Sequence, residues 1–366
     1  MSEGDPGGMG GPVLVIGTGL IGTSVALSLR RADVDVLLSD VDEPALREAV
    51  GMGAGRRVDE SDVPVIVVVA VPPRHASRVL ADASTRFPQA TLTDVTSVKE
   101  RVIRQAVEAG ADPTRLVGGH PMAGREVSGA SGGRADLLDD RLWVVTPLEG
   151  SGIEHVRQVH RLVSACGAYP VEMTLADHDA AVALVSHTPQ VLASVLAAQL
   201  ADSDQDYVRV AGQGLRDMTR IAASNVPMWS DILAANAGPV ADVLDGIVAR
   251  LQQTSAALRE GAAERMAADP RVERVLAAGV AGQRMIPGKH GAAPSAYREV
   301  SVMLADRPGE LGRLFGAAAE AGVNLEDVRI EHVLGRPSGL VDISVRPDVG
   351  EELIAALLER GFDVRS

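Results

Sequence analysis

A glycine-rich run near the N-terminus has the residue types and the spacing needed to hold a pyrophosphate group. Residues 17–22 read Gly-Thr-Gly-Leu-Ile-Gly; they follow the apolar run 13–16 and open an amphipathic stretch. In such a strand–turn–helix unit the first glycine permits the tight turn, the second lets backbone approach the phosphates, and the third lets the helix pack on the strand. The helix N-terminus adds N–H groups and positive potential. We therefore predict a dinucleotide site formed by Gly17, Gly19, Leu20, Ile21 and Gly22.

The next predicted strand ends at an acidic residue that suits the ribose of this dinucleotide. A carboxylate at Asp40 can accept hydrogen bonds from both hydroxyls of an adenosine ribose, and Asp42 is the competing carboxylate. The acid favours NAD over NADP, because a 2′-phosphate would meet a negative charge with no adjacent arginine. A further strand ends at Val71 before Pro72, where a strand stop and a cofactor contact are equally consistent with the sequence.

Two histidines and an acid–arginine pair outside this unit are further candidates for a functional site. A short apolar run delivers His120 to the predicted ligand edge of the sheet, where neighbouring glycines leave the imidazole uncovered. His187 precedes Pro189, which perturbs any helix that contains it and could aim the imidazole inward. Asp217 and Arg220 are three residues apart, so a helix-surface ion pair is as consistent with their spacing as a functional pair.

The elements that must position these residues change in kind along the chain. From residue 13 to about 173, short β-branched runs alternate with amphipathic stretches, the pattern of βαβ units in a mostly parallel, doubly wound sheet. After that point the strand signal stops, and long Ala-, Leu- and Val-rich helical patterns continue to residue 285. We therefore predict a Rossmann-type α/β domain over 12–173 and an all-helical domain over 174–285. Strands are expected at 13–17, 34–40, 65–71, 90–95, 116–119, 142–146 and 168–172.

The remaining segments indicate how the chain is assembled. Two helical stretches, 179–200 and 240–258, are apolar over more than one stripe, so each is expected to pack against several neighbours, including another subunit; a homodimer is the resulting hypothesis. Residues 286–296 contain glycine and proline without a period and are predicted to be a linker. Residues 297–366 follow the order βαββαβ, with its second strand at 323–332, which is the ferredoxin-like plan.

Composition and charge exclude several classes of protein. Lys plus Arg number 35 and Asp plus Glu number 49, and the net charge of −14 argues against binding to nucleic acid or to anionic membranes. No apolar run is expected to reach the roughly 20 residues of a membrane span. The single Cys166 excludes an internal disulfide and a cysteine-based zinc site, no metal site is predicted, and a reducing, cytoplasmic compartment is expected. Residues 1–11 lack the features of a signal peptide and are predicted to be a disordered tail.

Five motifs, in order along the first two predicted domains, resemble those of the prephenate and arogenate dehydrogenases of tyrosine biosynthesis, the TyrA family. The motifs are the glycine-rich run 17–22, Asp-Val-Thr-Ser-Val-Lys at 94–99, Gly-Gly-His-Pro-Met-Ala-Gly at 118–124, Ser-His-Thr-Pro at 186–189, and Asp-Met-Thr-Arg-Ile-Ala at 217–222 with Trp229 downstream. The resemblance implies NAD-dependent oxidative decarboxylation of a cyclohexadienol, in which hydride leaves the carbinol carbon and loss of CO2 aromatises the ring. We predict prephenate as the substrate; arogenate, which carries an amine in place of the keto group, is the alternative.

The same resemblance implies roles for individual residues. His120 matches the catalytic histidine, which would take the proton of the ring hydroxyl, a task that suits a neutral imidazole near its ordinary pKa. Ser97 matches a serine that helps orient that hydroxyl and the histidine. Arg220 matches an arginine that binds a substrate carboxylate, a task that suits a planar guanidinium. Thr96 departs from the family, which commonly has glycine there. The further substrate-pocket positions are Glu126, His187, Asp217 and Trp229.

The C-terminal unit resembles an ACT domain, a small module that binds amino acids in biosynthetic enzymes. In that family the loops of paired modules form the effector pocket, and helix N–H groups suit an amino-acid carboxylate. The matching positions are Asp306, Pro308, Gly309, Leu311, Asn324 and Leu325. We therefore predict feedback regulation by tyrosine, with a purely structural dimerisation module as the alternative.

Two other functions compete for the whole chain. A β-hydroxyacid dehydrogenase also joins a Rossmann domain to a helical one, but nothing outside the glycine motif supports its lysine-centred chemistry. A non-catalytic amino-acid sensor would use the C-terminal unit as its output. That alternative is disfavoured because His120, Ser97 and Arg220 are all present.

Overall fold

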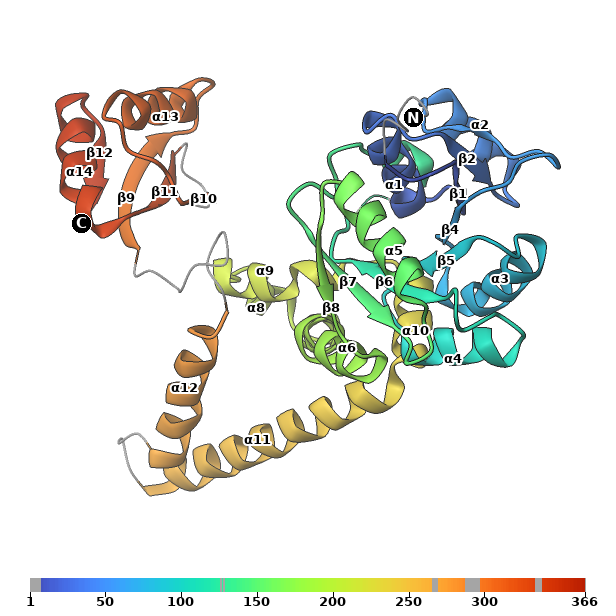
Figure 1. Ribbon diagram of the computed structural model, residues 1–366. Coiled ribbons are helices and arrows are strands. Elements are labelled where there is room, and N and C mark those ends of the chain that lie inside the picture. Colours follow the sequence, from blue (N-terminus) through green and yellow to red (C-terminus); the bar gives the residue numbers. More distant parts are fainter. Residues whose placement is uncertain are drawn as a thin grey trace. The chain divides into compact units, whose positions relative to one another are not determined.

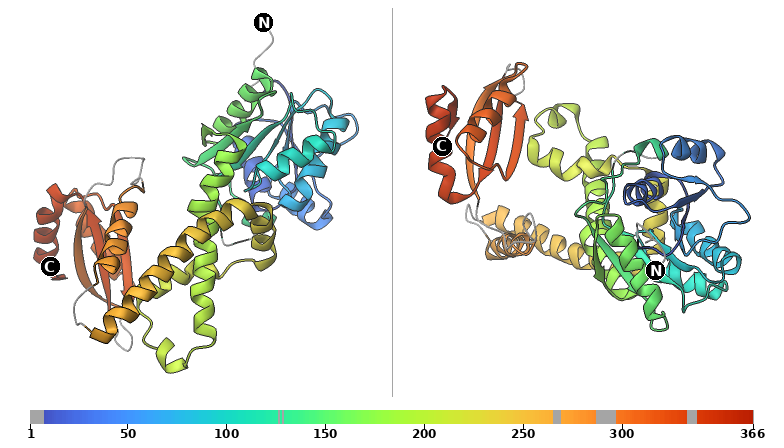
Figure 2. Two further views of the ribbon diagram at one scale, coloured as in Figure 1. Left: turned by 90° about the horizontal axis from the view of Figure 1, so that it is seen from below. Right: turned by 45° about the horizontal axis from the view of Figure 1, so that its top comes forward.

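The computed structural model separates into two compact units, residues 1–248 and 249–366, and each is described by itself (Figures 1 and 2). The division falls inside helix α11 (Ala237–Glu264), within the block predicted as one helical domain. The structure describes residues 8–125, 127, 129–264, 269–286, 297–332 and 338–365.

The first unit contains a parallel sheet of five strands, as expected for βαβ units. Strand order is β3-β2-β1-β4-β5, and every pairing is parallel. All residues of β4 are fully buried, because a parallel sheet of this kind is covered on both faces. The sequence does not predict β3, since its two arginines are exposed and carry no apolar signal. The strands are β1 (Val13–Ile16), β2 (Val36–Ser39), β3 (Arg56–Arg57), β4 (Ile66–Val69) and β5 (Thr91–Asp94).

Helices cover both faces of this sheet and confirm the predicted Rossmann-like arrangement (Figure 1). Side chains alternate along β1, so that Val13 and Val15 join one apolar core while Leu14 joins the other. The first core is completed by α1 (Leu20–Arg31), α2 (Glu43–Gly51) and α5 (Ile153–Ala165), and the second by α3 (Pro73–Arg86) and α4 (Glu100–Glu108).

A smaller sheet extends the fold beyond β5. It contains β6 (Val117–Pro121), β7 (Leu142–Pro147) and β8 (Tyr169–Glu172); β6 and β7 are antiparallel, and β7 and β8 are parallel. Leu116, just before β6, forms a parallel bridge with Leu92 of β5. Therefore β6 ends at the same edge as β1, β4 and β5, which is where ligands bind in parallel sheets.

The N-terminal segment differs from the prediction at Met9. This side chain is only 2% exposed and packs in the first core, so the predicted disordered tail over 1–11 is wrong at this residue. Residues 1–7 lie outside the described part of the chain.

The helical stretch predicted at 179–200 is interrupted, in agreement with the expectation that Pro189 perturbs its helix. Helix α6 (Leu175–Val182) passes through a π-helical turn, Ala183–His187, into α7 (Thr188–Ala201). Taken together, Leu175–Ala201 has a window of mean hydropathy 1.5, of which 33% is buried. It is long and apolar enough to cross a membrane by length and composition, so the expectation of no such stretch is wrong; a core helix of a soluble protein passes the same test. Four more helices follow in order: α8 (Gln205–Val208), α9 (Gln213–Thr219), α10 (Val226–Ala235) and α11.

The second unit contains the predicted βαββαβ order. Its four strands form an antiparallel sheet in the order β10-β11-β9-β12, with α13 and α14 packed on one apolar core. The second strand was expected at 323–332, but Val323 still closes α13 through a hydrogen bond to Ala318, so the strand begins later. The predicted linker, apart from Ile286, lies outside the described residues. The elements are α12 (Pro270–Gln283), β9 (Arg298–Ala305), α13 (Glu310–Glu320), β10 (Asp327–His332), β11 (Ser338–Val345), α14 (Gly350–Glu359) and β12 (Asp363–Arg365).

Candidate active site

The turn between β1 and α1 has the shape that a dinucleotide phosphate requires. Gly17 has φ +104°, and a Cβ there would lie 2.4 Å from the Ala70 carbonyl oxygen. A Cβ on Gly22 would lie 2.0 Å from the Gly17 carbonyl oxygen, so only glycine lets α1 pack this closely. A Cβ on Gly19, the N-cap of α1, would meet no atom within 4 Å. Gly17 and Gly22 are thus required by the packing of the turn, whereas the free space at Gly19 leaves room for a phosphate. These residues fit the dinucleotide cofactor.

Asp40 lies directly beside this turn. Its Oδ2 accepts hydrogen bonds from the Thr18 backbone N–H at 2.6 Å and the Thr18 hydroxyl at 2.8 Å. The carboxylate of Asp42 instead caps α2 by accepting the N–H of Ala45 at 3.2 Å. This geometry favours Asp40 over Asp42 for the predicted ribose contact.

The end of β4 contacts the same turn. Val71 Cγ1 lies 3.0 Å from where a Cβ on Gly17 would be, so the side chain borders the predicted phosphate site. Pro72 is the N-cap of α3, and its position at a helix start accounts for it without a ligand.

His120 lies near the end of β6, on the same edge of the sheet as the glycine turn. A Cβ on the preceding Gly119 would lie 2.7 Å from the Asp94 carbonyl oxygen and 2.8 Å from Trp143 Nε1. A Cβ on Gly118 would lie 2.3 Å from Thr146 Oγ1. The glycines are therefore needed for close approach of β6 to its neighbouring strands, a packing role that the sequence does not indicate.

A buried ion pair holds the backbone that carries His120. Lys99 and Asp94 are both fully buried and form an ion pair. Lys99 Nζ also donates to the Gly119 carbonyl oxygen at 2.7 Å, and Asp94 Oδ1 accepts the Gly119 N–H at 3.2 Å. Both backbone polar groups of Gly119, the residue before His120, are thus held by side chains at the two ends of the β5–α4 loop. The sequence shows both charged residues in its second motif but gives no sign that they meet Gly119.

The same loop contains Ser97 and Thr96. Ser97 is half-buried between β5 and α4. The Thr96 hydroxyl contacts Asp94 and lies 2.8 Å from the Val98 carbonyl oxygen, and its backbone N–H donates to Asp94 at 3.0 Å. The departure from glycine at position 96 is therefore accommodated by hydrogen bonds inside the loop. The role of Ser97 stays a prediction.

His120 contacts a second histidine, His178, which in turn contacts Asp179. The sequence does not single out either residue. His120 Nδ1 lies 2.8 Å from His178 Nε2, and His178 Nδ1 lies 2.8 Å from Asp179 Oδ1. Asp179 also accepts the backbone N–H groups of Lys99 at 2.8 Å and Glu100 at 2.9 Å. His178 and Asp179 are adjacent in α6. The run Asp-His-Asp at 177–179 is the one feature of the sequence that indicates a histidine–carboxylate contact.

Burial lowers the pKa of two imidazoles of this site, His120 and His187. It lowers the pKa of His120 well below 6.5, and the positive charges that His178, Lys99 and His187 can carry act in the same direction. The expectation of an ordinary pKa for His120 is therefore wrong. Burial also lowers the pKa of His187, to about 4. Burial lowers the pKa of Lys99 too, against the opposing effect of Asp94.

His187 points inward, which is one of the two outcomes that the sequence left open for the residue before Thr188-Pro189. It is 1% exposed at the end of the π-helical turn, and Pro189 stands in the first turn of α7. The Asn236 amide nitrogen donates to the Asp179 carbonyl oxygen at 2.8 Å and lies 3.0 Å from His187 Nδ1. Because that amide has hydrogens for both contacts, Nδ1 accepts and the proton of neutral His187 is on Nε2. The ring of Trp229 lies edge-on to His187, with centroids 6.0 Å apart.

Two of the remaining predicted substrate residues, Arg220 and Asp217, lie at the surface of the same unit. Arg220 begins a 3-10 turn, Arg220–Ala222, that packs against α7, and its side chain is exposed. Asp217 is also exposed and accepts a hydrogen bond from the Gln213 side chain at 2.8 Å. Glu126 lies outside the described residues. The substrate roles of these three residues stay predictions.

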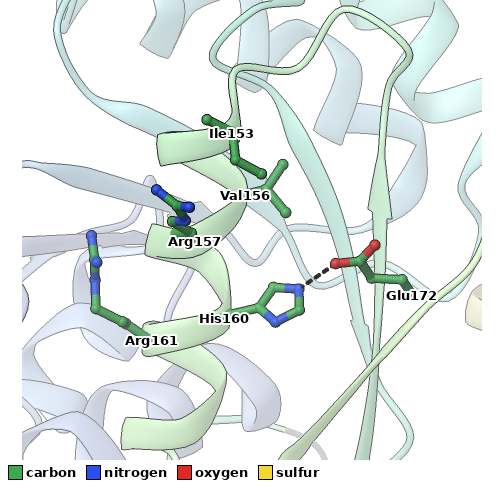
Figure 3. Close-up of a pocket in the computed structure, with 6 residues that line it drawn as sticks. All are labelled: Ile153, Val156, Arg157, His160, Arg161 and Glu172. Atoms are coloured by element: carbon green, nitrogen blue, oxygen red, sulfur yellow. Dashed lines mark ion pairs between the residues drawn. The ribbon is translucent and has the colours of Figure 1, made fainter.

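A surface pocket of about 280 Å³ lies beside α5 and β8 (Figure 3). His160 Nε2 lies 2.9 Å from Glu172 Oε1 across it. None of the predicted site residues lines this pocket, so it is not the predicted substrate site. The lining residues are Ile153, Val156, Arg157, His160, Arg161 and Glu172.

The predicted effector residues of the second unit fall at two places. Asp306, Pro308, Gly309 and Leu311 surround the start of α13, and Gly309 has φ +94°. Asn324 and Leu325 follow the end of α13, and the Asn324 amide donates to Glu326 at 3.1 Å. A helix of 11 residues is about 16 Å long. The two groups therefore lie at opposite ends of one helix, and one copy of the module does not bring them together.

Comparisons with known proteins agree with this geometry. Residues 25–172 match the prephenate dehydrogenase nucleotide-binding domain, and residues 174–269 match the prephenate dehydrogenase dimerization domain. A probable prephenate dehydrogenase of Streptomyces niveus, NovF, is 35% identical over 96% of this chain and 99% of its own length. The prephenate dehydrogenase of Bacillus subtilis is 26% identical over 92% of each chain.

Two solved structures are similar over about three quarters of the chain. Prephenate dehydrogenase from Aquifex aeolicus, in complex with hydroxyphenyl propionate and NAD+, has a TM-score of 0.66 at 26% identity and covers 75% of this chain and 97% of its own. Arogenate dehydrogenase from Synechocystis has a TM-score of 0.64 at 25% identity, covering 74% and 98%. The chain belongs to the prephenate dehydrogenase family of NAD-dependent oxidoreductases.

Proposed function

We propose that this enzyme oxidises and decarboxylates prephenate to 4-hydroxyphenylpyruvate. The observation that carries the proposal is the position of His120: a neutral imidazole on the sheet edge that also holds the glycine turn. Family membership supports the reaction class. The Aquifex relative, solved with NAD+ and a hydroxyphenyl acid, supports the kind of ligands that such a site takes.

The reaction needs a base and a hydride acceptor at one carbon of the ring. NAD, held at Gly17, Gly19, Gly22 and Asp40, supplies the hydride acceptor. His120 accepts the proton of the ring hydroxyl while hydride leaves the same carbon. The bond to the ring carboxylate then breaks, CO2 leaves, and the electron pair of that bond aromatises the ring. His120 returns its proton to the phenol oxygen, so the base is regenerated and no net proton is released.

Other side chains are proposed to hold the substrate. Arg220 would bind a substrate carboxylate through its guanidinium. His187 presents an Nε2–H and can donate a hydrogen bond without carrying a charge. Ser97 would orient the ring hydroxyl toward His120.

The initial rate of NADH formation tests the proposed reaction. We expect turnover of prephenate with NAD and little with NADP, because Asp40 opposes a 2′-phosphate. Turnover of arogenate alone would reassign the substrate, and no turnover of either by folded, NAD-binding protein would refute the family reaction for this chain.

The chain is also proposed to form a homodimer, in which two copies associate through the helical segment that includes α6, α7 and α11. The matched dimerization domain supports it. So do large apolar side chains exposed in the single chain along the helical segment, among them Leu184, Val185, Val195, Val248 and Leu251. Cytoplasmic localisation is also proposed, with the free, buried Cys166 as its support.

Tyrosine is the proposed effector of the second unit. Its βαββαβ order and the sequence of its loops support an ACT module. Because the two predicted loop groups stand at opposite ends of α13, an effector pocket would need loops from two paired copies. We expect saturating tyrosine to lower the rate and raise the melting temperature of the full chain. If tyrosine, phenylalanine and tryptophan all leave both quantities unchanged, the regulatory proposal fails.

A further inference from the structure

We propose that His178 and Asp179 are positioning residues that decide which nitrogen of His120 receives the substrate proton. The proposal rests on the proposed function, because it concerns the same proton transfer. It starts from an unbroken chain of contacts, His120 Nδ1 to His178 Nε2 at 2.8 Å and His178 Nδ1 to Asp179 Oδ1 at 2.8 Å.

The proposed arrangement places one hydrogen in each contact of this chain. An ionised Asp179 can only accept, so His178 Nδ1 carries the hydrogen between them. In the proposed arrangement this is the one N–H of His178, so its Nε2 accepts from His120 Nδ1–H. Neutral His120 then has its lone pair on Nε2. The chain thus directs the basic nitrogen of His120 away from His178 and leaves it available to the substrate hydroxyl.

The surroundings of Asp179 keep it ionised. The side chain is 3% exposed, and burial alone would favour its protonated form. The hydrogen bonds from His178 and from the backbone N–H groups of Lys99 and Glu100 outweigh burial and lower the pKa of Asp179. These N–H groups belong to the N-terminal end of α4, where a negative charge is also favoured.

The chain also provides for the charge that forms during the reaction. When Nε2 of His120 takes a proton, its Nδ1–H still donates to His178, which remains joined to the Asp179 carboxylate. Through this chain the Asp179 carboxylate would stabilise the imidazolium, against burial and the opposing charge of Lys99. If His178 only filled space, neither the direction of these hydrogen bonds nor the ionisation of Asp179 would matter for the rate.

The first test replaces Asp179 by asparagine. Asp179→Asn removes the charge and can present an amide N–H to His178, which would reverse the protons along the chain. We expect kcat to fall by about 10²-fold or more with KM for prephenate changed little. The acid limb of the kcat/KM profile should move to lower pH, because loss of the anion destabilises protonated His120.

Asp177→Asn is the matched control. Asp177 lies two residues away in the same helix, is exposed, and carries the same charge, but its carboxylate contacts Thr174 rather than a histidine. We expect this variant to keep the wild-type kcat and acid limb. Equal behaviour of the two variants, in rate and in pH profile, would overturn the proposal.

Two substitutions of His178 separate its hydrogen bonds from its shape. His178→Phe keeps a flat ring but removes both nitrogens, and we expect it to lose kcat to a degree similar to Asp179→Asn. His178→Gln keeps an amide that can accept from His120, and we expect it to recover part of the rate. If Phe and Gln at this position give the same rate, the hydrogen-bonded chain does not position His120.

A spectroscopic readout separates failure of this proposal from failure of the proposed function. Nitrogen-15 NMR of histidine-labelled full-length protein, with His120 assigned through His120→Asn, reports which ring nitrogen carries the proton. We expect Nδ1–H and a bare Nε2 on His120 at neutral pH; the opposite tautomer would refute the proposal. The measurement needs no substrate, so it decides the proton arrangement even if prephenate is not turned over.

Discussion

The burial of His120 determines the chemistry that this residue can perform. A histidine on the surface would be partly protonated near neutral pH, and a protonated imidazole cannot accept the substrate proton. Burial and the neighbouring Lys99 hold His120 neutral, which makes it a competent though weaker base. The sequence identifies this residue from its loop and motif, but not the shift in its pKa. That shift comes first from burial and then from groups on the β5–α4 loop, α6 and the π-helical turn, which only the fold brings together.

Removing this base should abolish most of the activity. We expect His120→Asn to lower kcat by about 10²- to 10⁴-fold, the usual contribution of a general base, with KM for prephenate nearly unchanged. Steady-state kinetics of folded variant and wild-type protein measure both quantities. Near-normal turnover by the variant would remove His120 from the catalytic role.

The pH dependence of the rate should report the lowered pKa of His120. The base works only when deprotonated, so kcat/KM should fall as pH drops through the pKa of His120 in the free enzyme. Since burial lowers this pKa, the acid limb should lie below 6.5. A limb above that value, measured from about pH 5 to about pH 9 with NAD saturating, would contradict the assigned environment.

His187 should make the folded state less stable in acid. Its pKa is lowered to about 4 in the folded state, whereas the unfolded chain has the ordinary value of 6.5. Between these values the unfolded state binds the proton more readily, so stability is lost as pH falls from 6.5 toward 4. Denaturant unfolding at several pH values should show a weaker pH dependence for His187→Gln than for wild type. The exposed His75→Gln is the control, and equal slopes for both variants would contradict this account.

At the scale of elements, apolar patterns are the part of the sequence that predicts well. Buried strands such as β4 and β5 carry runs of apolar or β-branched residues, and the structure contains them close to the expected bounds. β3 escapes prediction because its arginines are exposed. The π-helical turn before α7 is an intermediate case, since Pro189 indicates a break in the helix without specifying its form.

The chain of hydrogen bonds behind His120 escapes prediction for another reason. His178 and Asp179 lie on α6, and only the packing of that helix against α4 and β7 brings them next to β6. No local pattern encodes a contact between residues 58 positions apart. Sequence motifs therefore identify His120 and Ser97, while the groups that orient His120 become visible only in the fold.

The close approach of β6 to β5 requires glycine at position 119. A Cβ on Gly119 would meet the Asp94 carbonyl oxygen and Trp143 Nε1, so we expect Gly119→Ala to destabilise the protein by about 1–3 kcal/mol and to lower kcat by displacing His120. Gly51→Ala, where a Cβ meets no atom within 4 Å, is the control and should be neutral or slightly stabilising. Chemical denaturation measures both, and equal stabilities would contradict the close approach.

At the scale of the whole molecule, the exposed apolar side chains of the helical segment call for a second subunit. Val195 on α7 is 56% exposed in the single chain, and Val63, in a loop of the first unit, is 72% exposed. We expect light scattering to give twice the mass of the chain for wild type and for Val63→Asp, but a shift toward the single-chain mass for Val195→Asp. A monomeric wild type, or a dimer that Val195→Asp leaves intact, would contradict the proposed interface.

The measurement that tests the central claim most directly is the initial rate of NADH formation from NAD and prephenate, compared between wild type and His120→Asn. The proposed function predicts clear turnover by wild type and a loss of about 10²-fold or more in a variant that still folds and binds NAD. Absence of turnover by folded, NAD-binding wild type, with prephenate and with arogenate, would contradict it.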